Sequence, residues 1–436
     1  MFEGLDDIDW SSLTHAYGPS NDVPGLLRAR ASTDAAVVAE TNDALFGNII
    51  HQGTVYPVTA PAVPFLVNLL MNRRTLDRVS LVYLLAAIAG GSSRRPGLSG
   101  QTLDAVERGA DDFWKLIDDP AVRIAIPYLL SKLPAETARI CTNAPLLVGS
   151  NGEALFEASM LFCWAACEPP EPGRAAPFLT LLREGRTPLI RLGGALGVLR
   201  LGAPAGVEEA MGVYFEAFSD PSINAGVQER VAIYMESLGM TPPQKNEPSA
   251  TQAPGDLGRQ VGLLDAYFQN LSDPSLAGNE EERMQHLLEN LSVPPPSEPP
   301  SAPAPGERKP LVEPSPYEPR HEQWGWGEGS IYTVLLDWVS QMSPVAREAL
   351  LRWVPSHIAK LDDYAGPKLA LEILPLAFDP EHLPENRAEL NPLQFSALHA
   401  LAQDTCTLYA DPLIVGIQRA LGLPPRDMKR LQAFLQ

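Results

Sequence analysis

One phrase recurs along the chain and decides the fold: PAVPFLVNLL at 61–70, AIPYLLSKL at 125–133 and APFLTLL at 176–182. Each copy joins a proline to an aromatic residue and a leucine. A second phrase accompanies it, as DPAVR at 119–123 and TPLIR at 187–191. Self-similarity at intervals of roughly 40–60 residues is typical of stacked helical hairpins. The sequence therefore predicts an all-α chain arranged as an α-solenoid.

Apolar residues at three- and four-residue spacing predict helices in nearly every segment outside 241–330. Polar caps and early prolines mark helix starts, as where Asn21-Asp22 precedes Val23-Pro24. The proline of the repeated triplet is expected to bend the first helix of a hairpin, and the two residues after it are expected to pack. Val122-Arg123 and Ile190-Arg191 are interpreted as parts of the helix that closes a hairpin.

Composition divides the chain into three parts. Residues 1–240 read as HEAT-like helical repeats and residues 331–436 as a C-terminal helical region. Residues 241–330 hold 16 of the 43 prolines and are predicted to be a proline-rich linker region with one short helical hairpin over 257–271 and 280–291. The tract 293–319 is expected to be extended and polyproline-like. Limited proteolysis is expected to cut there, or within 241–255, first.

Charge and cysteine content bound the partners and the compartment. The 53 acidic and 33 basic residues give a net charge of −20, which disfavours nucleic acid and favours a basic protein partner. The chain has no run of 18 apolar residues and no signal-peptide pattern at its start, so no membrane span is expected. Four cysteines without a disulfide spacing favour the reducing cytoplasm.

Two features resemble a known family. Asp-Pro-x-Val-Arg, with continuations such as LIRLGGALGVLRLG at 189–202, resembles HEAT repeats over residues 21–240. The stretches 44–66 and 391–425 are similar to segments of bacterial HEAT-repeat proteins of mostly unassigned role. Repeat lengths vary here, and several units lack the Val-Arg dipeptide. The resemblance implies a right-handed α-solenoid that recognises proteins, and it implies no catalytic residue.

Polar and aromatic residues near the amino terminus are the first candidates for partner binding. Aromatics beside carboxylates can accept a basic partner, and alternatively Trp10 and Tyr17 close the open end of a solenoid as a cap. The loop at 47–57 offers a second candidate ridge, whose members alternatively pack and bond to the backbone. The candidates from both segments are Asp6, Asp7, Asp9, Trp10, His51, Gln52 and Tyr56, with His15 and Tyr17 beside the acids.

Two further groups have a structural alternative. Trp324 and Trp326 could form a ligand platform or anchor the linker on the next helices. Cys163 and Cys167 share a helix face at a spacing that suits two metal ligands, but the apolar stretch around them favours core cysteines. We expect no metal site and no cofactor.

The function expected from the sequence is that of a non-catalytic, cytoplasmic protein-binding scaffold or adaptor. Its most concrete form is an inhibitor or immunity-type protein that holds a basic partner on an acidic surface. Motifs of metalloproteases, P-loop enzymes and serine hydrolases are missing. The alternative is an enzyme on a HEAT scaffold, either DNA glycosylase-like or tetrapyrrole lyase-like.

Overall fold

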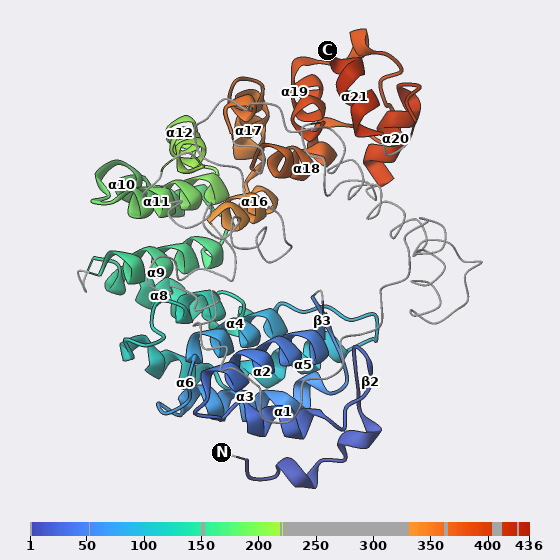
Figure 1. Ribbon diagram of the computed structural model, residues 1–436. Coiled ribbons are helices and arrows are strands. Elements are labelled where there is room, and N and C mark those ends of the chain that lie inside the picture. The colour runs from blue at the N-terminus through green and yellow to red at the C-terminus, as the bar shows by residue number, and fades with distance from the viewer. Residues whose placement is uncertain are drawn as a thin grey trace, which may run out of the picture. The chain divides into compact units, whose positions relative to one another are not determined.

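The computed structural model describes residues 2–51, 53–149, 153–218, 220, 331–361, 365–402, 412–424 and 427–436. Most of these residues are helical, and the strands among them form two very short hairpins (Figure 1). The expectation of an all-α chain is thus confirmed. The expected hairpin over 257–271 and 280–291 and the extended tract 293–319 lie outside the described residues.

The α-helices before residue 150 are α1 Val23–Ala29, α2 Ala35–Asn48, α3 Thr59–Met71, α4 Arg78–Ala89, α5 Leu98–Glu107, α6 Ala110–Lys115, α7 Ile126–Leu130 and α8 Thr137–Leu147. Those after it are α9 Ala154–Cys167, α10 Ala176–Glu184, α11 Pro188–Leu201, α12 Val207–Ala217, α16 Ile331–Gln341, α17 Pro344–His357, α18 Ala365–Ala377, α19 Pro392–Leu401, α20 Pro412–Ala420 and α21 Met428–Leu435.

Short elements complete the described fold. Strands β1 Thr14–His15 and β2 Gly18–Pro19 pair antiparallel, as do β3 Ile50–His51 and β4 Thr54–Val55. The 3-10 helices are η1 Leu5–Asp7, η2 Trp10–Ser12, η3 Leu116–Asp118, η4 Pro134–Glu136, η5 Pro172–Ala175, η6 Ile358–Lys360 and η7 Arg387–Glu389.

Helix α11 shows how the sequence sets the bounds of a core helix. Thr187 caps it by accepting a hydrogen bond from the Ile190 N–H at 3.2 Å, and Pro188 occupies the first turn. Gly202 ends it with a φ of +71°, a conformation that glycine adopts without strain. The helix is apolar on nearly every side. A Cβ added at Gly197 would lie 2.2 Å from the ring of Phe178 on α10. The lack of a side chain there lets α10 approach closely.

The repeated phrases do not occupy equivalent positions. Pro64 lies inside α3, as the bending interpretation requires, whereas Pro127 and Pro177 lie in the first turn of α7 and α10. A first-turn proline leaves the helical hydrogen bonds intact. Val122-Arg123 precedes α7 in a turn, while Ile190-Arg191 belongs to α11. The bend expected of every triplet is therefore not a shared feature.

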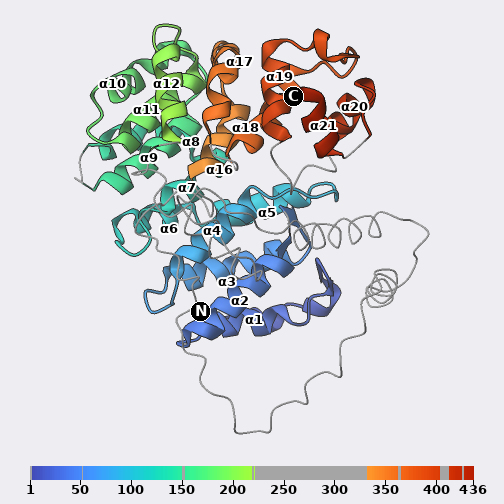
Figure 2. The same cartoon turned by 45° about the horizontal axis from the view of Figure 1, so that its top comes forward.

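Most helices pack against helices close to them in the chain. Helix α3 contacts α4 and α5, α4 contacts α7, α8 contacts α9, and α11 contacts α9, α10 and α12 (Figure 2). Their buried faces form one continuous hydrophobic cluster. None of the helices in the described ranges is long and apolar enough to span a membrane.

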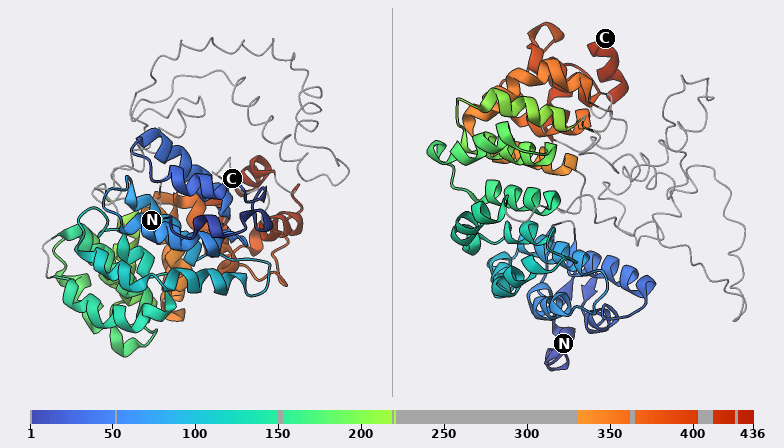
Figure 3. Two further views of the ribbon diagram at one scale, coloured as in Figure 1. Left: turned by 90° about the horizontal axis from the view of Figure 1, so that it is seen from below. Right: turned by 90° about the vertical axis from the view of Figure 1, so that its left-hand side faces the viewer.

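Helices that follow residue 330 pack directly onto α11 and α12. The Trp338 Nε1 donates to the Leu196 carbonyl at 3.0 Å, and the Tyr214 hydroxyl donates to the Leu335 carbonyl at 2.7 Å. The backbone N–H of Ser343 donates to the Leu199 carbonyl at 3.0 Å. In Figure 3, right, the orange helices accordingly lie against the green ones. The described residues up to 220 and from 331 onward thus belong to one compact unit.

Two buried arginines fasten the loop between α3 and α4. Arg30 is fully buried and donates to the carbonyls of Leu76 and Asp77 at 2.9 and 2.6 Å. Burial lowers the pKa of Arg30 to about 10, although the nearby Asp77 carboxylate raises it. Arg78 donates to the Leu70 carbonyl at 2.6 Å. These bonds hold the carboxyl end of α3 and the amino end of α4 in place.

Candidate functional site

The structure brings the two amino-terminal candidate segments together. The β1–β2 hairpin lies against the β3–β4 hairpin, because the Ala16 N–H donates to the Asn48 carbonyl at 3.1 Å. The Val58 N–H donates to the Thr14 carbonyl at 3.4 Å. Across this junction the Tyr17 hydroxyl lies 3.4 Å from the His51 Nδ1, with the two rings edge to face. Segments more than thirty residues apart therefore form one surface.

A polar network fixes this junction. The His15 Nδ1 accepts a hydrogen bond from the Tyr17 N–H at 3.0 Å, so the neutral ring carries its proton on Nε2. That Nε2 donates to the Asp22 carboxylate at 3.1 Å. The Asn48 amide donates to the other oxygen of the same carboxylate at 2.7 Å. With only 8% of the His15 side chain exposed, this network anchors the hairpin.

The candidate residues of the loop at 47–57 differ in how far their side chains are exposed to solvent. Tyr17, which stands over His51, is 70% exposed, and His51 itself is partly exposed. Tyr56 is half-buried against the hydrophobic core, and its backbone N–H donates to the Thr59 hydroxyl at 2.9 Å. Gln52 lies outside the described residues. His51 and the exposed Tyr17 therefore lie on the same surface, while Tyr56 packs against the core.

The amino-terminal acids surround a buried tryptophan. Trp10 is 6% exposed, donates from Nε1 to the Leu5 carbonyl at 2.7 Å, and packs near the ring of Phe65. Its burial agrees with the cap interpretation, but Tyr17, the other residue assigned to the cap, is 70% exposed and does not. Asp6 pairs with Arg28 at 2.5 Å.

Asp9 and Asp7 are both exposed but differ in their partners. A hydrogen bond from the Ser11 hydroxyl lowers the pKa of Asp9. The Asp7 carboxylate has no hydrogen bond or ion pair within the described parts of the chain. Partner binding by any of these acids stays a prediction.

A surface pocket of about 530 Å³ includes Ile8, which lies between Asp7 and Asp9 in the chain. Its lining comes from three places: Ile8 of the amino-terminal segment, the first half of α3 with Pro57 two residues before it, and one face of α5 with Arg108 directly after it. The lining residues are Ile8, Pro57, Ala60, Pro61, Pro64, Phe65, Leu98, Gln101, Asp104 and Arg108. We call this the α3–α5 pocket. Sequence analysis missed its α5 wall, although the spacing of residues 98, 101, 104 and 108 signals a single helix face.

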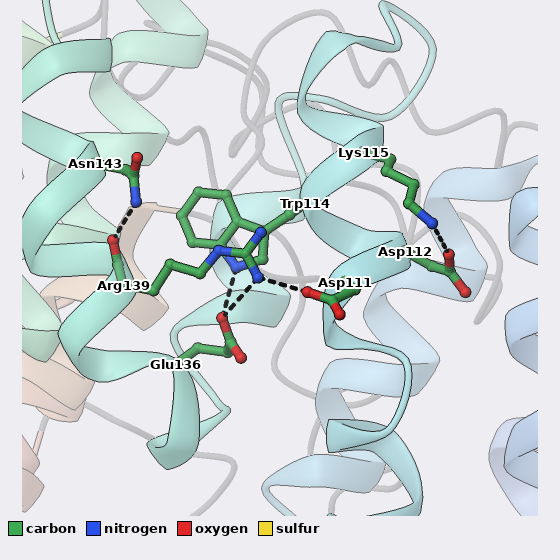
Figure 4. Close-up of polar contacts among 7 residues, drawn as sticks. All are labelled: Asp111, Asp112, Trp114, Lys115, Glu136, Arg139 and Asn143. Atoms are coloured by element: carbon green, nitrogen blue, oxygen red, sulfur yellow. Dashed lines mark hydrogen bonds and ion pairs between the residues drawn. The ribbon is translucent and has the colours of Figure 1, made fainter.

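A second polar cluster is shown in Figure 4, between α6 and α8. The Trp114 Nε1 donates to Glu136 at 2.7 Å, and the Arg139 guanidinium stacks 4.6 Å from the indole centroid. Arg139 also pairs with Asp111 at 2.8 Å. Nearby, Lys115 pairs with Asp112 at 2.7 Å, so charged groups of both signs are matched throughout the cluster. These contacts join neighbouring helices through paired charges.

The cysteines do not assemble a metal centre in the described residues, where no three His, Cys, Asp or Glu side chains are grouped to hold an ion. Cys163 is fully buried, and burial raises its pKa well above the ordinary value. The partly exposed Cys141 has its pKa raised by burial to about 12. Cys163 is thus a core residue. Trp324 and Trp326 lie outside the described residues.

Comparison with known proteins adds no assignment. No family model matches the chain, and neither a curated protein nor a solved structure matches it.

Proposed function

We propose that the chain is a non-catalytic protein-binding scaffold with a HEAT-like solenoid arrangement, whose acidic amino-terminal end holds a basic partner protein. The observation that carries the proposal is the α3–α5 pocket, which has an apolar wall on α3 and the exposed carboxylate of Asp104 on α5. Apolar contacts supply binding energy at the centre of an interface, and unpaired charges at its edge select the partner.

The helix contacts support the solenoid part of the proposal. Neighbouring pairs such as α8 with α9 and α10 with α11 pack together, and α11 also contacts α9. The α8–α9 pair thus contacts the α10–α11 pair, which is the kind of contact expected between stacked hairpins. An end of such a stack is a place where a cap and a binding surface coincide. On this proposal the amino-terminal segment supplies both, with Trp10 buried as part of the cap and Asp7 exposed for the partner.

The form of scaffold that we favour is an inhibitor or immunity-type protein in the bacterial cytoplasm. The net charge of −20 favours a basic partner at long range. The described cysteines are all free thiols, which fits a reducing compartment. On this proposal the bound partner is an enzyme or toxin whose activity falls when the complex forms.

The test is capture of the partner from an extract of the native host, followed by direct measurement with the purified protein. We expect binding that weakens as salt rises from 50 to 500 mM, because exposed charges are screened. Replacing Asp6, Asp7 and Asp9 together with Asn should weaken it further while leaving thermal unfolding nearly unchanged. Salt-sensitive, sub-micromolar binding to duplex DNA, with no protein partner, would overturn the scaffold proposal.

A further inference from the structure

The two walls of the α3–α5 pocket differ in chemistry. The α3 side presents Ala60, Phe65 and three prolines, at 57, 61 and 64. Because proline has no backbone N–H, this wall offers almost no hydrogen-bond donor. Ile8 extends the same apolar surface. Whatever the pocket binds must therefore place apolar groups against α3.

The α5 wall is polar beyond its first residue. Leu98 is buried at one end, and Gln101, Asp104 and Arg108 follow at three- and four-residue steps with exposed side chains. Steps of this size keep all four on one face of the helix, over about 15 Å. Along the helix the wall is thus apolar at Leu98, polar at Gln101, acidic at Asp104 and basic at Arg108.

The charged groups of this wall are unengaged within the described residues. Asp104 and Arg108 stand one turn apart, yet neither side chain forms a hydrogen bond or ion pair there. Asp7 and Asp9 are both exposed and flank the lining residue Ile8 in the chain. Together with Asp104 of the lining they are three carboxylates against the one guanidinium of Arg108, a balance that complements a basic ligand.

We propose that the α3–α5 pocket takes a short amphipathic segment of a partner protein, with an aliphatic side chain against the α3 prolines and a lysine or arginine beside Asp104. The proposal rests on the protein-binding function above and assigns that function to one place. The pocket volume lies within the range of ligand sites in proteins, and it accommodates side chains rather than a folded domain. The rest of the partner lies over the neighbouring acids.

The probe is a fluorescein-labelled synthetic peptide of about twelve residues, with leucines on one helical face and lysines on the other. Fluorescence polarisation measures its binding to the full chain. Two comparison peptides replace the lysines with glutamate, or the leucines with serine. We expect each replacement to weaken binding at least about ten-fold, since the pocket needs both chemistries. Hydrogen exchange should show protection at 57–65 and 98–108 when the first peptide binds.

Three variants locate the effect. Ala60→Arg places a long cation in the hollow and should weaken peptide binding more than about ten-fold. Asp104→Asn should weaken it roughly two- to five-fold, as expected for an exposed charge pair. Glu184→Gln, an exposed acid on α10, is the matched control and should leave binding unchanged. Thermal unfolding of each variant confirms that the fold is retained.

The outcomes separate this inference from the scaffold proposal. If the captured partner binds and the triple Asn variant weakens it, but Ala60→Arg and Asp104→Asn do not, the pocket assignment is wrong and the scaffold stands. Peptide binding with exchange protection elsewhere also overturns the pocket assignment. If neither the peptide nor any host protein binds, both proposals fail.

Discussion

The carboxylate of Asp119 forms an ion pair with Arg78 in which both side chains are buried. It accepts a hydrogen bond from the Arg78 guanidinium at 2.8 Å across 41 residues of sequence, and both side chains are at least 92% buried. A second carboxylate oxygen accepts from the Ala121 N–H at 3.1 Å. Arg73 approaches to 3.7 Å from solvent. Replacing Asp119 with Ala therefore leaves a buried cation without its counter-charge.

The expected cost follows from these contacts. Removing one partner of a buried ion pair destabilises a protein by about 3–5 kcal/mol, because the remaining charge is desolvated and unpaired. Loss of the Ala121 hydrogen bond adds about 1 kcal/mol. The bond from Arg78 to the Leu70 carbonyl survives and limits the damage. We expect Asp119→Ala to lower the free energy of unfolding by about 3–5 kcal/mol.

Urea and thermal unfolding of the purified chain measure this change. At roughly 2 °C per kcal/mol for a large domain, Tm should fall by at least about 6 °C. Arg73→Gln is the control, because that side chain is 83% exposed, and it should cost less than about 1 kcal/mol. The double replacement Arg78→Met with Asp119→Leu should be milder than Asp119→Ala alone. A change below 1 kcal/mol for Asp119→Ala would refute the reasoning.

Three other outcomes are expected. Trp10→Ala should lower the free energy of unfolding by about 3–5 kcal/mol, as loss of a buried tryptophan does, and a thermal melt close to wild type would exclude the cap interpretation. Gly197→Ala should cost about 1–3 kcal/mol, because the added Cβ would lie 2.2 Å from the Phe178 ring. Gly47→Ala should instead raise the free energy of unfolding by up to about 1 kcal/mol, because the added Cβ meets nothing within 4 Å. Equal urea midpoints for the two variants would contradict the packing argument. Burial by itself would raise the pKa of Asp119, but the hydrogen bonds from Arg78 and the Ala121 backbone, with the charge of Arg78, lower it below its ordinary value. The ionised Asp119 therefore stabilises the fold above that ordinary value, and this stabilisation is lost as the pH falls through the folded-state pKa. The difference in urea midpoint between wild type and Asp119→Asn should accordingly shrink between pH 6 and pH 3, and a constant difference would argue against the pair.

Local pattern predicted that the chain is helical, and the described residues are mostly helical. Thr187-Pro188 begins α11 and Gly202 ends it, as cap and breaker residues do at the same positions in any helix. Three- and four-residue spacing of apolar side chains predicted α3 and α4 in the same way. These signals act within a few residues of the chain, so they are readable without knowing what the helix packs against.

The same local pattern misjudged the proline triplets. Pro64 and Pro127 occur in nearly the same phrase, but the first lies inside a helix and the second in a first turn. Where a helix begins relative to such a proline depends on which of the flanking residues pack against neighbouring helices. That choice is made by the neighbouring helices and not by the triplet.

The candidate site shows most clearly which features follow from the sequence and which from the tertiary structure. The sequence by itself determined the helical segments, the acidic amino terminus and the polar loop near His51, because composition and periodicity are properties of short stretches. Only the tertiary structure placed Tyr17 over His51 and set Ile8 and α3 opposite Asp104 on α5. Those positions depend on packing between segments tens of residues apart, where the shapes of buried side chains select one pairing of helix faces among many that the same apolar pattern permits.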